Sequence, residues 1–177
     1  ATVLLDQIVS KLSESEATTV LPRNTRGQAS ALSISESFTT LVRQRSAFFH
    51  ADGTPRSEPE VIGWIIAFLK TQFSDIQVQQ EPKLADGTRP DLLITLPDDQ
   101  IVIDVKRISS SSSSLVRSAA SQMVRYLSGC DASTGILVVS PRTPDEPMGR
   151  VDDVYATSAD RRFRIALFVP RPLLTEF

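Results

Sequence analysis

The sequence predicts a mixed α/β (α+β) fold in which a central mixed sheet is flanked by helices. Two patterns predict this class. Apolar residues recur at helical spacing in the first part of the chain and again near residue 120, and they alternate with a period of two in the segments between and after. The 177 residues suit one compact domain. Within it we expect an N-terminal helical extension, residues 1–55, and a core, residues 56–177.

Helices are expected before the first strand. Apolar residues on one helical face predict a helix over residues 3–12. Residues 18–35 are polar and contain a proline and a glycine, so we expect a connecting stretch there. A second helix is expected from Phe38 to Phe49, before the turn-forming residues 52–55.

A third helix is expected over residues 61–73. Its apolar residues surround most of the helix, which predicts packing on more than one side. Two starts fit the sequence. Ser57 can be the N-cap, with Glu60 completing a capping box, or Glu58 can be the cap, with Pro59 as the first helical residue.

From Ile76 on, segments of period two bounded by turn residues predict strands, and two later apolar runs predict inner strands. Two of these strands form a hairpin. After the hairpin come a serine run, a helix closed by Gly129, an inner strand, a long polar loop and a last inner strand. The expected strands are Ile76–Glu81, Asp91–Leu96, Ile101–Lys106, Ile136–Val139 and Phe163–Val169; the helix is Leu115–Leu127 and the polar loop is Pro141–Asp160.

The predicted hairpin gathers ionisable side chains at one end. With its tip at Asp98 and Asp99, Asp91 lies opposite Lys106, and Asp104 lies diagonally beside Asp91 on the same face. The other face is apolar and must be buried. Opposed and diagonal neighbours lie within about 8 Å of each other, so two carboxylates and one ammonium group converge. A solvated, ion-paired surface is the alternative interpretation.

The residue types at this end indicate phosphate chemistry assisted by a divalent cation. Two adjacent carboxylates repel each other unless a cation lies between them. Oxygen ligands suit Mg²⁺ or Mn²⁺ better than zinc, and a chain with one histidine and one cysteine has no multi-cysteine or two-histidine zinc motif. A nearby lysine can orient water or neutralise charge that develops on a phosphate.

The same residues resemble a known signature. Pro90-Asp91, followed by Asp104-Val105-Lys106, resembles the PD-(D/E)xK motif of the restriction-endonuclease-like nuclease superfamily. The predicted order of elements over residues 57–139 fits the αβββαβ core of that superfamily. Gln122 and Tyr126 on the following helix resemble the QxxxY element of one of its branches.

The resemblance implies a metal-dependent nuclease, a hydrolase that cleaves phosphodiester bonds in DNA, with RNA as the alternative substrate. Asp91, Asp104 and the Val105 carbonyl would bind Mg²⁺ or Mn²⁺. Lys106 would position the attacking water and the scissile phosphate. The superfamily contains many dimeric enzymes, so a homodimer or a larger assembly is also an expectation.

Further site residues follow from the resemblance. Gln122 would orient the site, while Tyr126 and Arg107 would contact the substrate. A helix would supply a third carboxylate, either Glu58 or Glu60. Helical steps from Glu58 reach apolar residues directed at the sheet, whereas the steps from Glu60 reach a weaker face, so Glu58 is preferred.

Charge and hydropathy restrict the partners. The net charge is −2 and the pI is about 5.5, so a nucleic-acid site must be a local basic patch. No apolar run approaches the about 20 residues of a membrane span, and no leader pattern opens the sequence, so we expect a cytoplasmic protein. The alternative function is a catalytically inactive module of the same fold that binds a nucleic acid, a small ligand or a protein partner.

Overall fold

The structure of the chain, a computed structural model, describes residues 29–108, 113–158 and 160–174. The helix predicted over residues 3–12 lies outside the described residues, as does most of the polar connection after it. The described elements are α2 (Ala31–Leu41), α3 (Arg45–Phe48), α4 (Glu58–Gln72), β1 (Gln77–Gln80), β2 (Leu92–Thr95), β3 (Gln100–Arg107), α5 (Ser113–Ser128), β4 (Thr134–Ser140), β5 (Met148–Ser158), β6 (Arg161–Pro170) and α6 (Arg171–Leu174).

The described strands form one mixed sheet of six strands in the order β1-β2-β3-β4-β6-β5. β1, β2 and β3 are antiparallel neighbours, and β3, β4 and β6 run parallel. β5 lies antiparallel to β6 at the far edge. The predicted class, a mixed sheet flanked by helices, is therefore confirmed.

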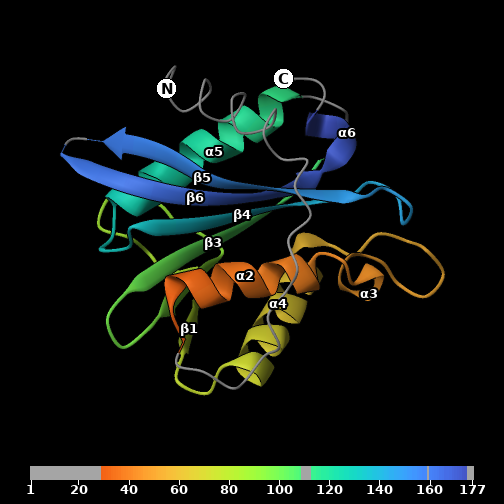
Figure 1. Cartoon of the computed structure of the whole chain (residues 1–177), viewed down its shortest axis with the longest axis horizontal. Helices are drawn as coiled ribbons and strands as arrows, with labels where there is room; N and C mark the ends of the chain where they lie inside the picture. Colours follow the sequence, from red (N-terminus) through yellow and green to blue (C-terminus); the bar gives the residue numbers. More distant parts are fainter. Residues whose placement is uncertain (1–28, 109–112, 159, 175–177) are drawn as a thin grey trace.

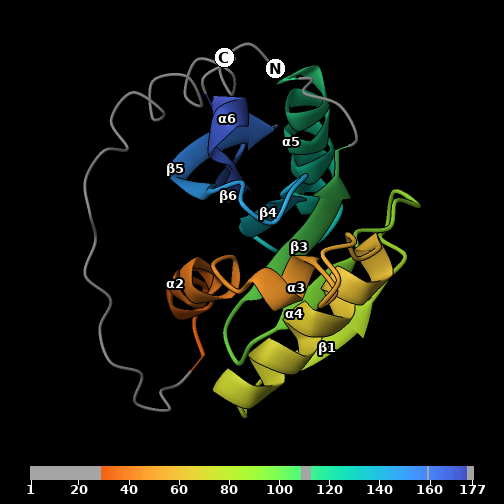
Figure 2. The ribbon, with the colours of Figure 1, turned by 90° about the vertical axis from the view of Figure 1, so that its right-hand side faces the viewer.

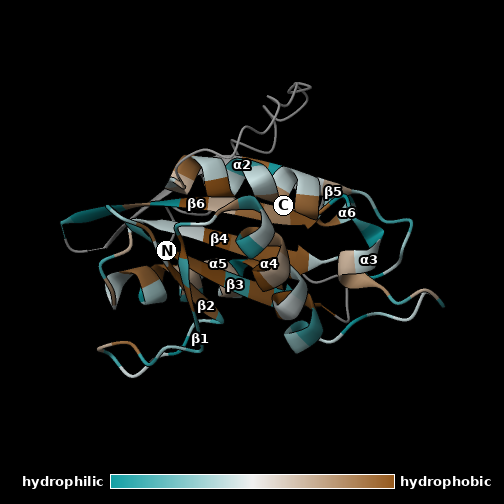
Figure 3. Cartoon of the chain, turned by 90° about the horizontal axis from the view of Figure 1, so that it is seen from below, coloured by the Kyte–Doolittle hydropathy of each residue, from teal (hydrophilic) through white to brown (hydrophobic). Residues whose placement is uncertain are grey.

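Helices cover both faces of the sheet (Figures 1 and 2). The helices α2, α3 and α4 lie on one face, and α5 and α6 lie on the other. Each face has its own apolar cluster, and the strands between the helices are strongly apolar (Figure 3). Phe38 of α2 packs on Phe168 of β6 with ring centroids 5.8 Å apart, so α2 belongs to the core of the sheet. None of the helices in the described part has the length and hydropathy needed to cross a membrane.

The predicted hairpin of β2 and β3 is present, but its tip differs from the expectation. Thr95 pairs with Gln100, so the tip lies at Pro97 and Asp98 instead of Asp98 and Asp99. The fixed φ of Pro97 suits the second position of a turn, and the turn is closed by the Leu96 N–H, which donates to the Asp99 carbonyl at 2.8 Å.

This change of register alters which side chains are neighbours. The shift is two residues along β3, so every side chain keeps its expected face. The wholly apolar face is buried as predicted. The prediction that Asp91 lies opposite Lys106 is wrong, because the observed register brings Asp104 beside Asp91.

The helix expected from Phe38 to Phe49 is wrong in its bounds. α2 begins within the expected connecting stretch, because Ser30 and Ser33 form a capping box at its start. It ends at Leu41, and the short helix α3 follows after a turn. Residues 42–44 are Val, Arg and Gln, so neither glycine nor proline announces this interruption.

The third predicted helix is confirmed as α4, and Ser57 is its N-cap. Glu60 completes the capping box, so the alternative start at Glu58 is wrong. The expected packing on more than one side is confirmed, because α4 contacts α2 and α3 as well as β3. Val61, Ile65 and Leu69 are buried, and Ile62, Trp64, Ile66 and Phe68 are partly buried against the same apolar cluster.

The polar loop expected over Pro141–Asp160 is wrong, because Met148–Ser158 form the edge strand β5. An edge strand pairs on one side only and does not need a continuous apolar run. The pairing with β6 is irregular between Val151 and Val154, so Asp152-Asp153 interrupts the alternation. The other predicted strands, and the helix that became α5, lie on the expected segments.

Candidate functional site

Two aspartates meet where β2 begins. Asp91 directly precedes β2, and its N–H donates to Asp104 Oδ1 on β3 at 3.3 Å. Asp91 Oδ2 in turn accepts from the Val105 N–H at 2.7 Å. These reciprocal bonds hold each carboxylate against the backbone of the other strand, so the hairpin itself fixes the pair.

Lys106 completes the cluster. Its Nζ lies 2.9 Å from Asp104 Oδ2, and its side chain is 30% exposed whereas that of Asp104 is 2% exposed. The ammonium therefore extends from a buried carboxylate toward solvent. Asp91, Asp104 and Lys106, which the sequence predicts to converge, do lie together, although in a different register. We call these three residues the acid–lysine cluster.

The electrostatics of the cluster follow from burial and from two acids sharing one cation. Burial raises the pKa of Asp91 to about 6, and the charge of Asp104 adds to this rise. Burial lowers the pKa of Lys106, but the contact with Asp104 outweighs it, so the pKa of Lys106 lies above its ordinary value. Lys106 is therefore a cation at neutral pH, and the site is one positive charge short of neutrality when both acids are ionised.

The donor set fits a divalent cation. Asp104 Oδ2 is fully buried, and the Lys106 ammonium lies 2.9 Å from it. Together with Asp91, it offers the hard oxygen ligands that Mg²⁺ and Mn²⁺ prefer. In the described part of the chain, however, no three His, Cys, Asp or Glu side chains lie close enough to share a metal.

The preferred third acid, Glu58, reaches the end of β3 without joining the pair. Glu58 Oε1 accepts from the Arg107 N–H at 2.9 Å, which ties the start of α4 to the end of β3. Side chains alternate along a strand, so Arg107 and Lys106 point to opposite faces of the sheet. The exposed Arg107 thus lies on the α4 side, and the acid–lysine cluster on the α5 side.

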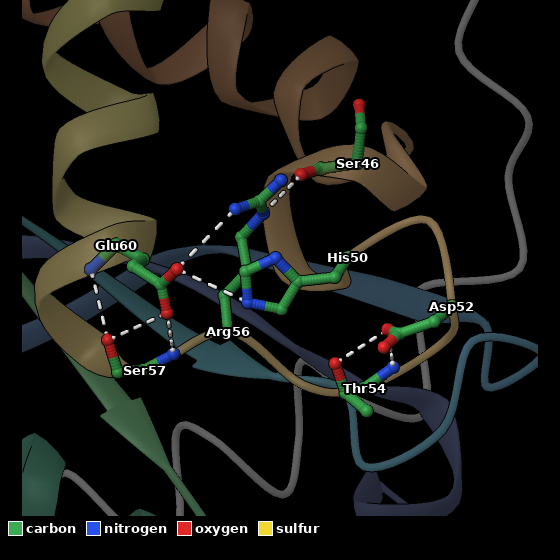
Figure 4. A network of polar contacts seen from close by, with 7 residues as sticks. All are labelled: Ser46, His50, Asp52, Thr54, Arg56, Ser57 and Glu60. Atoms are coloured by element: carbon green, nitrogen blue, oxygen red, sulfur yellow. Dashed lines mark hydrogen bonds and ion pairs between the residues drawn. The ribbon is translucent and has the colours of Figure 1, made fainter.

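Glu60 faces His50 and Arg56 at the start of α4 (Figure 4). Its carboxylate accepts from the Ser57 N–H at 2.8 Å and lies 3.2 Å from His50 Nε2 and 3.6 Å from Arg56. Hydrogen bonds from Ser57 lower the pKa of Glu60, as expected for a capping carboxylate. Of the two candidate glutamates, Glu58 is therefore the one directed at the sheet.

Helix α5 borders the cluster from the next layer. Tyr126 is 3% exposed, and Gln122 lies one helical turn before it on α5. Burial raises the pKa of Tyr126, and the charge of Asp104 raises it further, so the phenol is neutral and within electrostatic range of the cluster. The structure thus brings Tyr126 near the acids, with Gln122 beside it.

A hollow of about 680 Å³ opens on the other side of β3. It is formed where β3 and β4 end and α4 begins, and its lining is Pro55, Ser57, Glu58, Pro59, Arg107, Ile108, Pro141 and Arg142. It includes Glu58 and Arg107 and none of the acid–lysine cluster. Sequence reasoning missed Arg142, which the buried Glu146 carboxylate fixes at 2.6 Å and 3.0 Å. Their i,i+4 spacing directly after an inner strand was the available signal.

Comparison of the chain with known protein families and with curated proteins finds no match. The function must therefore be inferred from the geometry of the site.

Proposed function

We propose that this chain has a restriction-endonuclease-like core of the QxxxY-bearing branch and that it hydrolyses phosphodiester bonds in DNA, with RNA as the alternative substrate. The observation that carries the proposal is the acid–lysine cluster, in which two carboxylates and one ammonium meet on adjacent strands. The order α4-β1-β2-β3-α5-β4 supports it, since it is the αβββαβ order that the resemblance implies.

In this proposal each side chain has a separate task. A bound Mg²⁺ or Mn²⁺ would polarise the phosphate and lower the pKa of a bound water. Asp91 and Asp104 would hold the cation, with the Val105 carbonyl as a further ligand. Lys106 would then be freed from Asp104 to neutralise the charge that develops on the phosphate.

Three residues from other elements would support the site. Gln122 would orient the site from α5, and Tyr126 would remain a neutral donor because its pKa is raised by burial. Glu58 positions the end of β3 through the Arg107 N–H, so its effect on the cluster is indirect.

The test is the rate of Mg²⁺-dependent DNA cleavage by Lys106→Ala. We expect kcat to fall by about 10²–10³-fold, because a preorganised cation near the developing charge is lost. Cleavage of a labelled duplex and of a labelled single strand is followed on a gel, with the fold checked by circular dichroism.

The matched control is Lys70→Ala. Lys70 is an exposed lysine in the last turn of α4, on the opposite face of the sheet. The proposal expects this variant to cleave at the parent rate. A folded Lys106→Ala protein that cleaves as fast as the parent would show that the assignment of Lys106 is wrong.

A second candidate function has one observation in its favour. Asp104 is already paired with Lys106, and no third acid among the described residues joins Asp91 and Asp104. A module that binds a nucleic acid, a small ligand or a protein partner without cleaving it would need no metal site, and an ion pair between Asp104 and Lys106 would be sufficient for it. Binding of DNA by the parent, without cleavage in any divalent cation, would favour that function.

A further inference from the structure

The solvent-facing side of α5 carries arginines and serines and no acid. Arg117 and Arg125 are the two charged residues of Ser113–Ser128. They are exposed together with Ser114, Ser118, Ser121 and Ser128. We call these six residues the Arg–Ser face. A helix face with two arginines and no acid of its own forms a local basic patch in a chain whose net charge is −2.

The Arg–Ser face is continuous with the candidate site. Arg117, Ser121 and Arg125 are four residues apart, so they form a row along the helix. Gln122 and Tyr126 follow Ser121 and Arg125 by one residue and lie on the flank turned toward the acid–lysine cluster. A ligand that reaches the cluster past α5 therefore passes the Arg–Ser face.

The opposite side of α5 has a structural role that the Arg–Ser face does not share. Val116, Ala120 and Met123 are buried in the cluster of apolar residues on this face of the sheet.

One acid, Asp86, lies near Arg125. Hydrogen bonds from Thr88 hold Asp86 at 2.6 Å and 3.0 Å, so its carboxylate is already engaged in its own turn.

We propose that the Arg–Ser face binds the phosphodiester backbone of the DNA that the candidate site cleaves, an inference that rests on the proposed function. Arginines neutralise phosphates, and hydroxyls donate to phosphate oxygens. The short serine side chains allow the backbone to come close to the helix. Arg117 and Arg125 are separated by about 12 Å along the axis, roughly the length of three to four phosphates of one strand.

The test measures binding of a fluorescent DNA duplex, and of one of its strands, by anisotropy in EDTA at several salt concentrations. In the double variant Arg117→Gln/Arg125→Gln we expect Kd to rise about tenfold or more. The slope of log K against log salt should become shallower by about 2 for the duplex, or by about 1.4 for the single strand. The form of DNA that shows this loss is the one that the face binds.

The control is Arg43→Gln, an exposed arginine between α2 and α3 on the other side of the sheet. It should leave Kd and the salt slope unchanged. A third variant, Ser121→Lys, adds a cation between the two arginines and should tighten binding severalfold with a steeper slope. Tighter binding cannot result from misfolding, so this variant separates the proposal from a loss of structure.

The outcomes separate this inference from the proposed function. In one outcome the parent cleaves DNA, the double variant has the same Kd as Arg43→Gln, and Ser121→Lys binds no more tightly than the parent. The Arg–Ser face is then not the binding surface, and the proposed function stands. If the parent binds through this face but does not cleave, the inference stands and the proposed catalysis is wrong. A parent that binds neither form of DNA overturns the inference.

Discussion

Asp91 is the residue whose environment is most unfavourable without a cation. It is half-buried beside a second carboxylate, and one ammonium serves both. Burial raises the pKa of Asp91 to about 6 from its ordinary value of 3.8, so the folded chain binds a proton more tightly than the unfolded chain. This contribution to stability is complete below about pH 4 and is lost as the pH rises through 6.

Asp91→Asn should therefore stabilise the metal-free protein at alkaline pH. We expect the free energy of unfolding at pH 8 in EDTA to increase by about 1–3 kcal/mol, because an amide removes the repulsion and can still accept from the Val105 N–H. At pH 4 the variant and the parent should differ little. Urea unfolding at both pH values measures this, and a variant less stable than the parent at pH 8 would contradict the account.

At the scale of elements, the contact between α5 and the sheet positions the residues near the cluster. Gly135 of β4 lies under α5, and a Cβ at that position would be 2.6 Å from Met123 Sδ and 2.8 Å from Met123 Cγ. Glycine is needed here so that the helix can approach the strand. The spacing of α5 from β4 thus depends on one residue without a side chain.

Gly135→Ala should destabilise the fold by about 1–3 kcal/mol, because Met123 is fully buried and must shift. Met123→Ala alone should also destabilise, through the cavity that it leaves. The double variant should lose less than the sum of the two, because the added methyl occupies part of that space. Thermal unfolding of all four proteins measures the coupling; strict additivity would mean that Gly135 and Met123 do not share this contact.

The elements also show what the sequence could predict. α4, α5 and β3 have strong periodic patterns and β4 and β6 contain continuous apolar runs, and all five lie where expected. β5 could not be predicted, because it is a polar edge strand interrupted by an irregularity at Asp152-Asp153. The break between α2 and α3 is set by tertiary packing, since residues 42–44 carry no glycine or proline.

The sequence predicted which residues form the candidate site better than it predicted how these residues are arranged. Asp91, Asp104 and Lys106 were expected on one face, and a period of two preserves that face under a shift of two residues. Whether Lys106 or Asp104 is the direct neighbour of Asp91 depended on whether the tip lay at Asp98 and Asp99 or at Pro97 and Asp98. The hollow near Arg142 could not be foreseen, because it joins segments far apart in the sequence.

For the whole molecule, the central claim is that one sheet end combines a divalent-cation site with a nucleic-acid surface. The acid–lysine cluster comes from β2 and β3, and the Arg–Ser face comes from α5, which packs on the same face of the sheet. A net charge of −2 provides little long-range attraction for DNA, so the proposed binding would depend on this local surface and would weaken as salt is added.

The most direct measurement is the anomalous difference density of crystals soaked in Mn²⁺. The account expects a peak between the carboxylates of Asp91 and Asp104, with Lys106 displaced from Asp104, and no such peak in crystals of Asp104→Asn. Crystals of the parent that show no peak at this position, with the Lys106–Asp104 ion pair intact in saturating Mn²⁺, would contradict the claim.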